Sequence, residues 1–225
     1  MSRAAGGRGL FLREFLNHAY ATGALMPSGP RLAKALVRYV GEGDTTRRIL
    51  EVGPGTGAVT RHIVRRMAAA DRLDLVEINE SFINRLLHDL KHDAVLKPAA
   101  ERISLLQIPF EQFDQARCYD IIVSGLPMNN FSSELVESIF GKFRAMLAPG
   151  GTLSFFEYIA VRRAKAVISG RSQRRRLRQI KAVLACLFED HEIRRDVVLA
   201  NLPPAWVHHV RFSQTKMSGF PKVMV

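Results

Sequence analysis

"RILEVGPGTGAVTRHIV", residues 48–64, leads from an apolar run into a helical pattern through three glycines at alternate positions. A turn built from glycines lets the backbone approach a ligand without side-chain obstruction. Twenty residues after Gly57, Glu77 stands in the run "LDLVEI", where a carboxylate can accept hydrogen bonds from both hydroxyls of a ribose. The turn and Glu77 together predict a site for a nucleotide-like ligand, in preference to a plain strand-to-helix connection.

Short apolar runs bounded by charged residues or glycine predict buried strands on either side of this turn. They cover residues 48–52, 73–78, 102–106, 119–124 and 151–158. Helical periodicity fills the gaps after Gly57, Glu80 and Phe131. Such alternation predicts an α/β fold, in which helices cover both faces of a mostly parallel sheet.

The two ends of the chain have different patterns. "EIRRDVVLANLPPAWVHHVRF", residues 192–212, predicts two strands joined through residues 201–204, so that an antiparallel hairpin closes a seven-stranded sheet. Near the N-terminus, apolar residues that include Phe15 and Tyr20 share one face of a predicted amphipathic helix with basic residues just upstream. Such a helix can lie in a bilayer interface, or it can pack on the domain's own core.

Composition limits the class of protein. The 225 residues are 47% hydrophobic, enough to bury one sizeable core, and the formal net charge is +12. The segment from Arg162 to Lys181, both included, has nine basic residues and no acidic one. This charge predicts a polyanionic partner such as nucleic acid or acidic lipid headgroups. Two distant cysteines, Cys118 and Cys186, give neither a disulfide framework nor a zinc pattern, so we expect no metal and a reducing compartment. We find neither a signal peptide nor an apolar run of membrane-spanning length.

The stretch "ILEVGPGTG", residues 49–57, resembles motif I of the class I S-adenosylmethionine-dependent methyltransferases. This resemblance implies a Rossmann-like fold and S-adenosylmethionine as cofactor, with its methionine part near the glycine turn, its ribose near Glu77 and its adenine near the end of the third strand. In this family an acidic residue often follows that strand, where this chain has Gln107 and Ile108. The implied cofactor-binding residues are Glu51, Gly53, Gly55, Thr56, Gly57, Glu77, Ile78, Gln107, Ile108, Ser124 and Gly125.

The end of the fourth strand, "DIIVSGLPMNNF", residues 120–131, resembles the corresponding region of the rRNA adenine dimethyltransferases. In this chain Gly125 and Met128 replace the asparagine and the aromatic residue of that family. An extruded base needs an acceptor for its amino group and an aromatic face for stacking. The substitutions predict a site that does not recognise a base, so nucleic acid is not the expected substrate.

Three stretches resemble the bacterial phospholipid N-methyltransferases, which methylate phosphatidylethanolamine stepwise to phosphatidylcholine. They are "FLREFLNHAYATGALMPSG" at residues 11–29, "SGLP" at 124–127 and "NLPPAWVHH" at 201–209. The resemblance implies that the substrate is the headgroup amine of a membrane lipid. Related enzymes methylate ornithine lipids, and the sequence does not separate these headgroups. An rRNA adenine N6-methyltransferase is a more remote alternative, and a non-catalytic binder on the same fold is another.

These resemblances divide the chain into an N-terminal cap for membrane and substrate, residues 1–44, and a methyltransferase domain, residues 45–225. We expect Tyr20 and Ser124 to take part in catalysis, although Tyr20 could equally be a packing residue. We expect Phe15 to contact the membrane. The basic residues expected to hold lipid phosphate or an anionic membrane are Arg162, Arg163 and Lys165. The expected protein is a monomer in the cytoplasm, bound peripherally to the inner face of a bacterial membrane.

Overall fold

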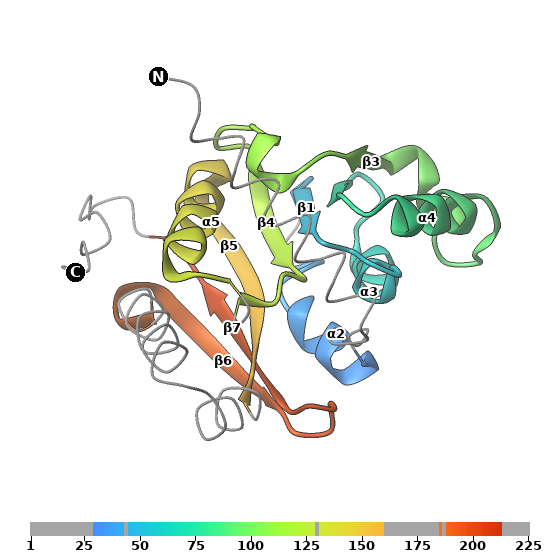
Figure 1. The fold of residues 1–225 in the computed structure, drawn as a ribbon. Coiled ribbons are helices and arrows are strands. Elements are labelled where there is room, and N and C mark those ends of the chain that lie inside the picture. The colour runs from blue at the N-terminus through green and yellow to red at the C-terminus, as the bar shows by residue number, and fades with distance from the viewer. Residues whose placement is uncertain (1–28, 43–44, 129–130, 160–184, 186–187, 213–225) are drawn as a thin grey trace.

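The computed structural model describes residues 29–42, 45–128, 131–159, 185 and 188–212. Its centre is a seven-stranded sheet with the order β3-β2-β1-β4-β5-β7-β6 (Figure 1). The strands are β1 Arg48–Val52, β2 Arg72–Glu77, β3 Ile103–Gln107, β4 Tyr119–Ser124, β5 Leu147–Tyr158, β6 Glu192–Val198 and β7 Ala205–Val210. Strands β1 to β5 pair in parallel, whereas β7 is antiparallel to both β5 and β6. The predicted sheet with its C-terminal hairpin is confirmed.

One strand differs from its prediction by more than a residue. Strand β5 begins at Leu147 and not at residue 151, because Leu147 pairs with Tyr119 before an irregularity in the register. Gly150 lies inside this irregular part with a φ of 77°, a left-handed value that favours glycine. The turn-like sequence "APGG" therefore forms part of the strand.

The helices are α2 Pro30–Leu36, α3 Ala58–Arg66, α4 Glu80–His92 and α5 Ser133–Met146, with short 3₁₀ helices at Lys97–Arg102 and Phe110–Gln112. Local sequence explains where two of them begin. The side chain of Asn79 accepts hydrogen bonds from the backbone N–H groups of Ser81 and Phe82, and the Ser132 hydroxyl accepts one from Leu135. These side chains satisfy donors that the first turn of each helix leaves unpaired.

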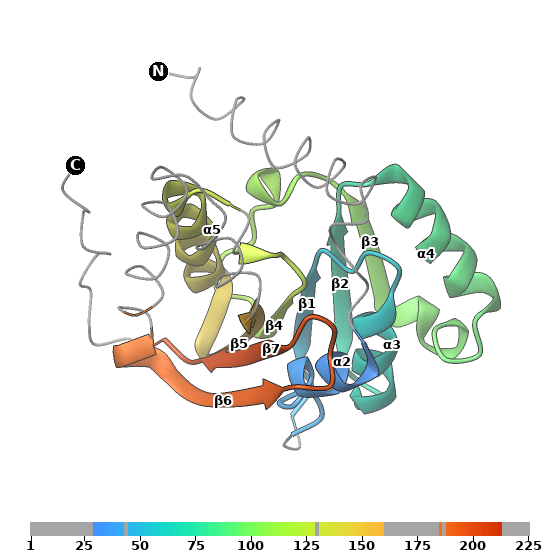
Figure 2. The same ribbon diagram turned by 60° about the horizontal axis from the view of Figure 1, so that its bottom comes forward.

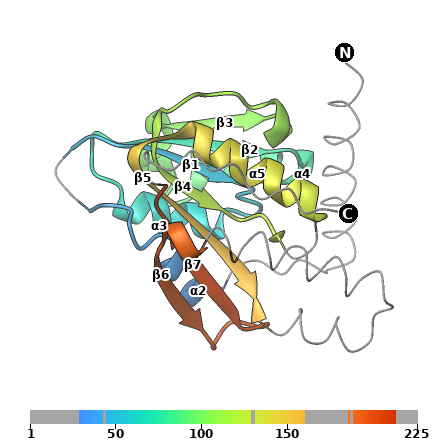
Figure 3. The same cartoon turned by 90° about the vertical axis from the view of Figure 1, so that its left-hand side faces the viewer.

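Helices cover both faces of the sheet (Figure 3), and the sheet separates the core into two hydrophobic clusters. Helix α5 packs on one face with Phe140 and Phe143 fully buried. Helices α2 and α3 pack on the other face, where Leu32 and Leu36 of α2 are also fully buried. Within the described ranges, no helix combines the length and apolar character needed to cross a bilayer.

Two buried histidines of β7 bind side chains of the neighbouring strands. His209 Nδ1 lies 2.8 Å from the Ser154 hydroxyl of β5, and its Nε2 lies 3.3 Å from a carboxylate oxygen of Asp196 on β6. On the opposite face, His208 Nδ1 lies 2.5 Å from Glu192 Oε1, and the ring stacks on Phe188 at 4.2 Å between centroids. Burial lowers the pKa of His209 to about 4, although Asp196 opposes the shift. Burial also lowers the pKa of His208, with Glu192 acting in the opposite direction.

We predict that the protein loses stability as the pH falls from about 6.5 to about 4. In the folded chain His209 stays neutral down to about pH 4 and His208 also binds a proton less readily than usual, whereas unfolding lets both bind protons near their usual pKa of 6.5. His209 alone accounts for up to about 3 kcal/mol of this loss. Urea unfolding at a series of pH values measures it. The His209→Gln variant should show a shallower pH dependence, whereas exposed His92→Gln on α4 should keep the original one; equal slopes in wild type and His209→Gln would contradict the assignment.

Candidate functional site

The loop between β1 and α3 depends on its three glycines. Gly53, Gly55 and Gly57 have φ values of 73°, 57° and 77°, in the left-handed region that other residues rarely adopt. A side chain at Gly57 would be strained by its φ of 77°, and its Cβ atom would also displace the ends of the Arg61 and Leu86 side chains, at 2.9 and 3.0 Å. The loop therefore presents bare backbone at the carboxyl edge of the sheet, as its sequence predicts.

Glu77 holds this loop against the end of β2. Its side chain is buried, and one carboxylate oxygen accepts a hydrogen bond of 3.1 Å from the Gly55 backbone N–H. The other oxygen accepts bonds of 2.8 and 2.9 Å from the N–H groups of Ile78 and Asn79. Burial raises the pKa of Glu77, while these three backbone donors lower it. Each carboxylate oxygen can accept more than one hydrogen bond, so Glu77 keeps acceptor capacity for ligand hydroxyls.

Glu51 is a buried carboxyl group with an unused acceptor. It is 1% exposed, and within the described part of the chain its Oε2 has no hydrogen-bond partner. Burial raises the pKa of Glu51 to about 8; the neighbouring Thr60 hydroxyl lowers it, and the Glu77 carboxylate raises it further. A buried acceptor without a partner is costly, which points to a ligand that supplies a donor or a positive charge.

The segment after β4 packs directly on the glycine loop. Gly125 donates a backbone hydrogen bond of 2.8 Å to the carbonyl of Val52, and a Cβ atom on Gly125 would come within 2.4 Å of the Gly53 carbonyl oxygen. Ser124 is fully buried, and its hydroxyl accepts a hydrogen bond of 3.3 Å from Leu126 N–H. Packing therefore excludes any side chain at Gly125. Met128 is 1% exposed and belongs to the core on the α5 face.

The residues expected near the adenine lie at the end of β3. Gln107 is exposed and pairs in register with Glu77 of β2, which places the two residues side by side at the carboxyl edge. Ile108 is partly buried and packs against the core on the α5 face. The structure thus brings the predicted positions from β1, β2, β3 and β4 to one edge of the sheet.

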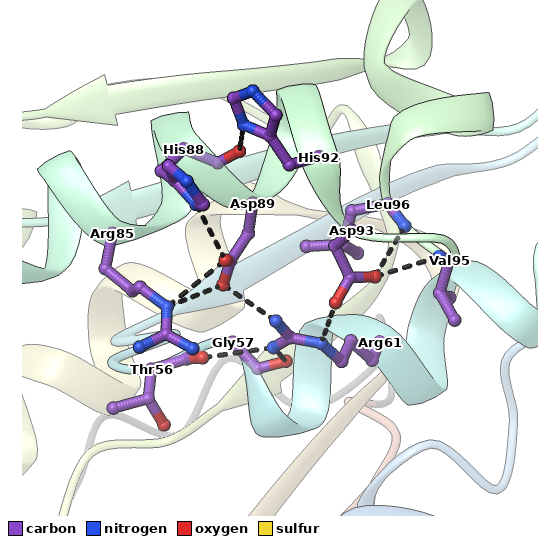
Figure 4. A network of polar contacts seen from close by, with 10 residues as sticks. All are labelled: Thr56, Gly57, Arg61, Arg85, His88, Asp89, His92, Asp93, Val95 and Leu96. Carbon is purple, nitrogen blue, oxygen red and sulfur yellow. Dashed lines mark hydrogen bonds and ion pairs between the residues drawn. The ribbon is translucent and has the colours of Figure 1, made fainter.

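An arginine that the sequence analysis missed fixes the back of the glycine loop (Figure 4). Arg61 Nη1 donates to the carbonyl oxygens of Thr56 and Gly57 at 3.1 and 3.0 Å. Its other two nitrogens bind Asp89 on α4 at 2.7 Å and Asp93 just after α4 at 2.8 Å. The only local signal is that Arg61 stands four residues after Gly57, at the start of a helix. Its partners lie too far along the chain for a sequence pattern to reveal.

Five predicted site residues, Phe15, Tyr20, Arg162, Arg163 and Lys165, lie outside the described residues, and their roles stay predictions. Two of the three stretches that carry the lipid-methyltransferase resemblance do meet. The backbone N–H of Gly29, the last residue of the first stretch, donates to Oδ1 of Asn201, the first residue of the third, at 3.1 Å. In the described part of the chain, no group of histidine, cysteine and acidic side chains is arranged to hold a metal ion.

Comparison with known proteins agrees with this geometry. The family described as "Methyltransferase domain" matches residues 49–151. An ornithine lipid N-methyltransferase from Singulisphaera acidiphila is 32% identical over 149 residues, which cover 64% of this chain and 74% of that protein. A tRNA1(Val) (adenine(37)-N6)-methyltransferase from Aeromonas hydrophila is 30% identical over 81 residues, 36% of this chain and 32% of that protein.

Among solved structures, an O-methyltransferase from Bacillus cereus in complex with SAH has the same fold, with a TM-score of 0.57 and 14% identity. The likeness covers 89% of this chain and 90% of that one. The chain therefore belongs to the class I S-adenosylmethionine-dependent methyltransferases, and its cofactor is S-adenosylmethionine. The fold and the cofactor expected from the sequence are both confirmed.

The described residues fit this cofactor. The unpartnered buried oxygen of Glu51 suits the amino group of the methionine part, and the three glycines with positive φ present backbone without side chains at the same edge of the sheet. Glu77 has acceptor capacity for the ribose hydroxyls. When bound, S-adenosylmethionine supplies a methyl group on a positively charged sulfur. The carboxyl groups of Glu51 and Glu77 match the positive charge of that molecule. The backbone of the glycine loop leaves its neighbourhood without side chains.

We predict that Gly125→Ala weakens cofactor binding at least tenfold, because the new methyl group must push the β4 segment away from the Gly53 carbonyl. Calorimetric titration with S-adenosylmethionine measures the affinity, and thermal unfolding measures the accompanying loss of stability. Gly141→Ala is the matched control, since a Cβ atom on Gly141 of α5 meets nothing within 4 Å. Unchanged affinity in Gly125→Ala would show that the contact between the two loops does not shape the cofactor site.

We predict that Arg61→Lys also weakens the affinity for S-adenosylmethionine, by roughly tenfold, because an ammonium cannot hold two carbonyls and two carboxylates at once. Arg85→Lys is the matched control. Arg85 also binds Asp89, at 3.1 Å, but no contact in the described part of the chain joins it to the glycine loop. The same titration decides the question: if Arg61→Lys and Arg85→Lys bind the cofactor alike, Arg61 has no special part in positioning the loop.

Proposed function

We propose that this methyltransferase transfers methyl groups to the headgroup amine of a membrane lipid, either phosphatidylethanolamine or an ornithine lipid. The observation that carries the proposal is the identity of 32% with a protein named as an ornithine lipid N-methyltransferase, along 74% of that protein's length. The contact between Gly29 and Asn201 supports it, because it joins two separate stretches of the lipid-methyltransferase resemblance.

The proposed chemistry is an in-line displacement in which the lipid amine attacks the methyl carbon and the carbon–sulfur bond breaks. An ammonium has no lone pair for this attack, so the site binds the neutral amine or removes its proton. A positively charged sulfur close to the amine favours the neutral form. Most of the remaining task is positioning of the amine in line with the bond that breaks. Ser124 and Tyr20 remain our candidates for that positioning, with the Ser124 hydroxyl already engaged by Leu126 N–H.

The described geometry argues against a base as the acceptor. Gly125 has no room for a side chain, and Met128 lies inside the core. Neither position can hold the amide acceptor or the stacking ring that an extruded adenine needs. The positive charge of the chain suits the phosphates of a membrane surface as well as those of a nucleic acid.

The first test is methyl transfer from labelled S-adenosylmethionine to separate vesicles that contain phosphatidylethanolamine or ornithine lipid, with ribosomal RNA as a parallel acceptor. We expect label in at least one lipid and none in RNA. Gly141→Ala should retain this activity and Gly125→Ala should lose most of it, which ties the label to the described site. Label in RNA alone would refute the proposal.

The two headgroups differ in one useful respect, because phosphatidylethanolamine carries a phosphate and ornithine lipid does not. We propose that Arg162, Arg163 and Lys165 hold this phosphate. Replacement of these three residues by glutamine should then lower transfer to phosphatidylethanolamine more than transfer to ornithine lipid, compared in vesicles of equal surface charge. An equal loss for both acceptors would assign these residues to the membrane surface instead.

A further inference from the structure

The turn between β6 and β7 exposes large apolar side chains. Leu199 is 72% exposed and Leu202 is 77% exposed, and Val197 at the end of β6 is 57% exposed. They are the three most exposed large apolar residues in the part of the chain that the structure describes. Large apolar side chains gathered at one tip are characteristic of a contact surface.

The turn is held in place by hydrogen bonds at both of its ends. Asn201, only 8% exposed, accepts a bond from Gly29 N–H and donates one of 2.8 Å to the Pro203 carbonyl. The N–H of Ile159, just after β5, donates a bond of 2.8 Å to the Pro204 carbonyl. The buried asparagine thus anchors the tip to the start of α2, while the leucines on either side of it stay exposed. Figure 2 shows the tip beside α2.

Basic side chains border Leu199, together with one exposed acidic side chain, Glu42. A groove of about 580 Å³ runs between α2 and β6, with Arg31, Lys34, Val197 and Leu199 among its lining residues. Two further arginines of the groove have partners within the chain: Arg38 binds Asp196 at 2.6 Å, and the Arg66 guanidinium binds the carbonyl oxygens of Arg38 and Val40. Arg31 and Lys34 are exposed on α2. Apolar side chains with cations beside them match the interface of an anionic bilayer.

The position of the tip relates it to the site. Tyr158 at the end of β5 pairs with Ala205 at the start of β7, so the β6–β7 turn emerges at the carboxyl end of β5. The glycine loop and the segment after β4 leave the sheet at the same edge. A membrane in contact with the tip would therefore lie on the side of the molecule where an acceptor amine has to arrive.

We infer that the β6–β7 tip is a membrane-contact surface, in which Leu199 and Leu202 enter the acyl boundary while Arg31 and Lys34 meet anionic headgroups. This inference rests on the proposed function, because a lipid acceptor requires the enzyme to work at a bilayer. It involves residues apart from the cofactor site.

The test is sedimentation with vesicles of equal parts phosphatidylglycerol and phosphatidylcholine. The double variant Leu199→Ser, Leu202→Ser should bind roughly tenfold less or weaker still, because two apolar side chains no longer leave water. Leu87→Ser is the matched control. This leucine is 45% exposed on α4, which connects β2 and β3 at the end of the strand order opposite to β7 and β6. Arg31→Gln and Lys34→Gln should each lower binding to these anionic vesicles roughly fivefold. Neither change should affect binding to vesicles of phosphatidylcholine alone.

The inference is overturned if the double variant sediments like the wild type, if the wild type does not sediment, or if the variant changes only the oligomeric state in solution. A second readout separates this result from the proposed function. Methyl transfer to a short-chain lipid dispersed in detergent needs no bilayer, so the double variant should match the wild type there while losing activity on vesicles. Absence of transfer to every dispersed lipid by the wild type would instead refute the proposed function, and sedimentation would still decide the role of the tip.

Discussion

The backbone of Gly125 and the backbone of Gly53 lie against each other, and this contact constrains the whole carboxyl edge of the sheet. A Cβ atom at Gly125 would come within 2.4 Å of the Gly53 carbonyl oxygen, so the β1 and β4 loops approach too closely for a side chain at this position. Glu77 then holds the glycine loop from the side of β2, and Arg61 holds it from the side of α4. The cofactor site follows from three attachments of one loop.

Charge in the site is arranged around a positively charged ligand. Glu51 and Glu77 are both buried, and burial raises the pKa of each, with that of Glu51 at about 8. Burial disfavours the charged form of Glu51, and a cationic group beside its unpartnered oxygen would favour that form again. The cationic amino group of the cofactor suits the Glu51 carboxylate, whereas the positively charged sulfur disfavours an ammonium on the acceptor. Two separate charges of the ligand thus serve binding and chemistry.

Local patterns predicted the sheet and the glycine loop, and the exceptions among the described residues have a common cause. The glycine turn, Glu77 and the strands around them follow from residues close together in the sequence. The prediction that the fifth strand begins at residue 151 was wrong, because the pairing of Leu147 with Tyr119 overrides a turn-like sequence. Arg61 was missed because its carboxylate partners lie 28 and 32 residues away, and Asn201 meets Gly29 across 172 residues. Contacts of that range come from packing, which one sequence does not reveal.

The reversed direction of β7 has a consequence for how such a fold can diversify. Because β7 runs against β5, the turn that precedes it opens at the carboxyl edge, whereas a parallel strand would have put that connection at the opposite edge. The cofactor loop tolerates almost no change, since its glycines are fixed by backbone geometry. The β6–β7 turn lies on the same edge, where hydrogen bonds fix Asn201 and the Pro204 carbonyl while Leu199 and Leu202 stay exposed. One end of the sheet therefore combines a loop whose backbone geometry requires glycine with a turn whose exposed side chains face no such requirement.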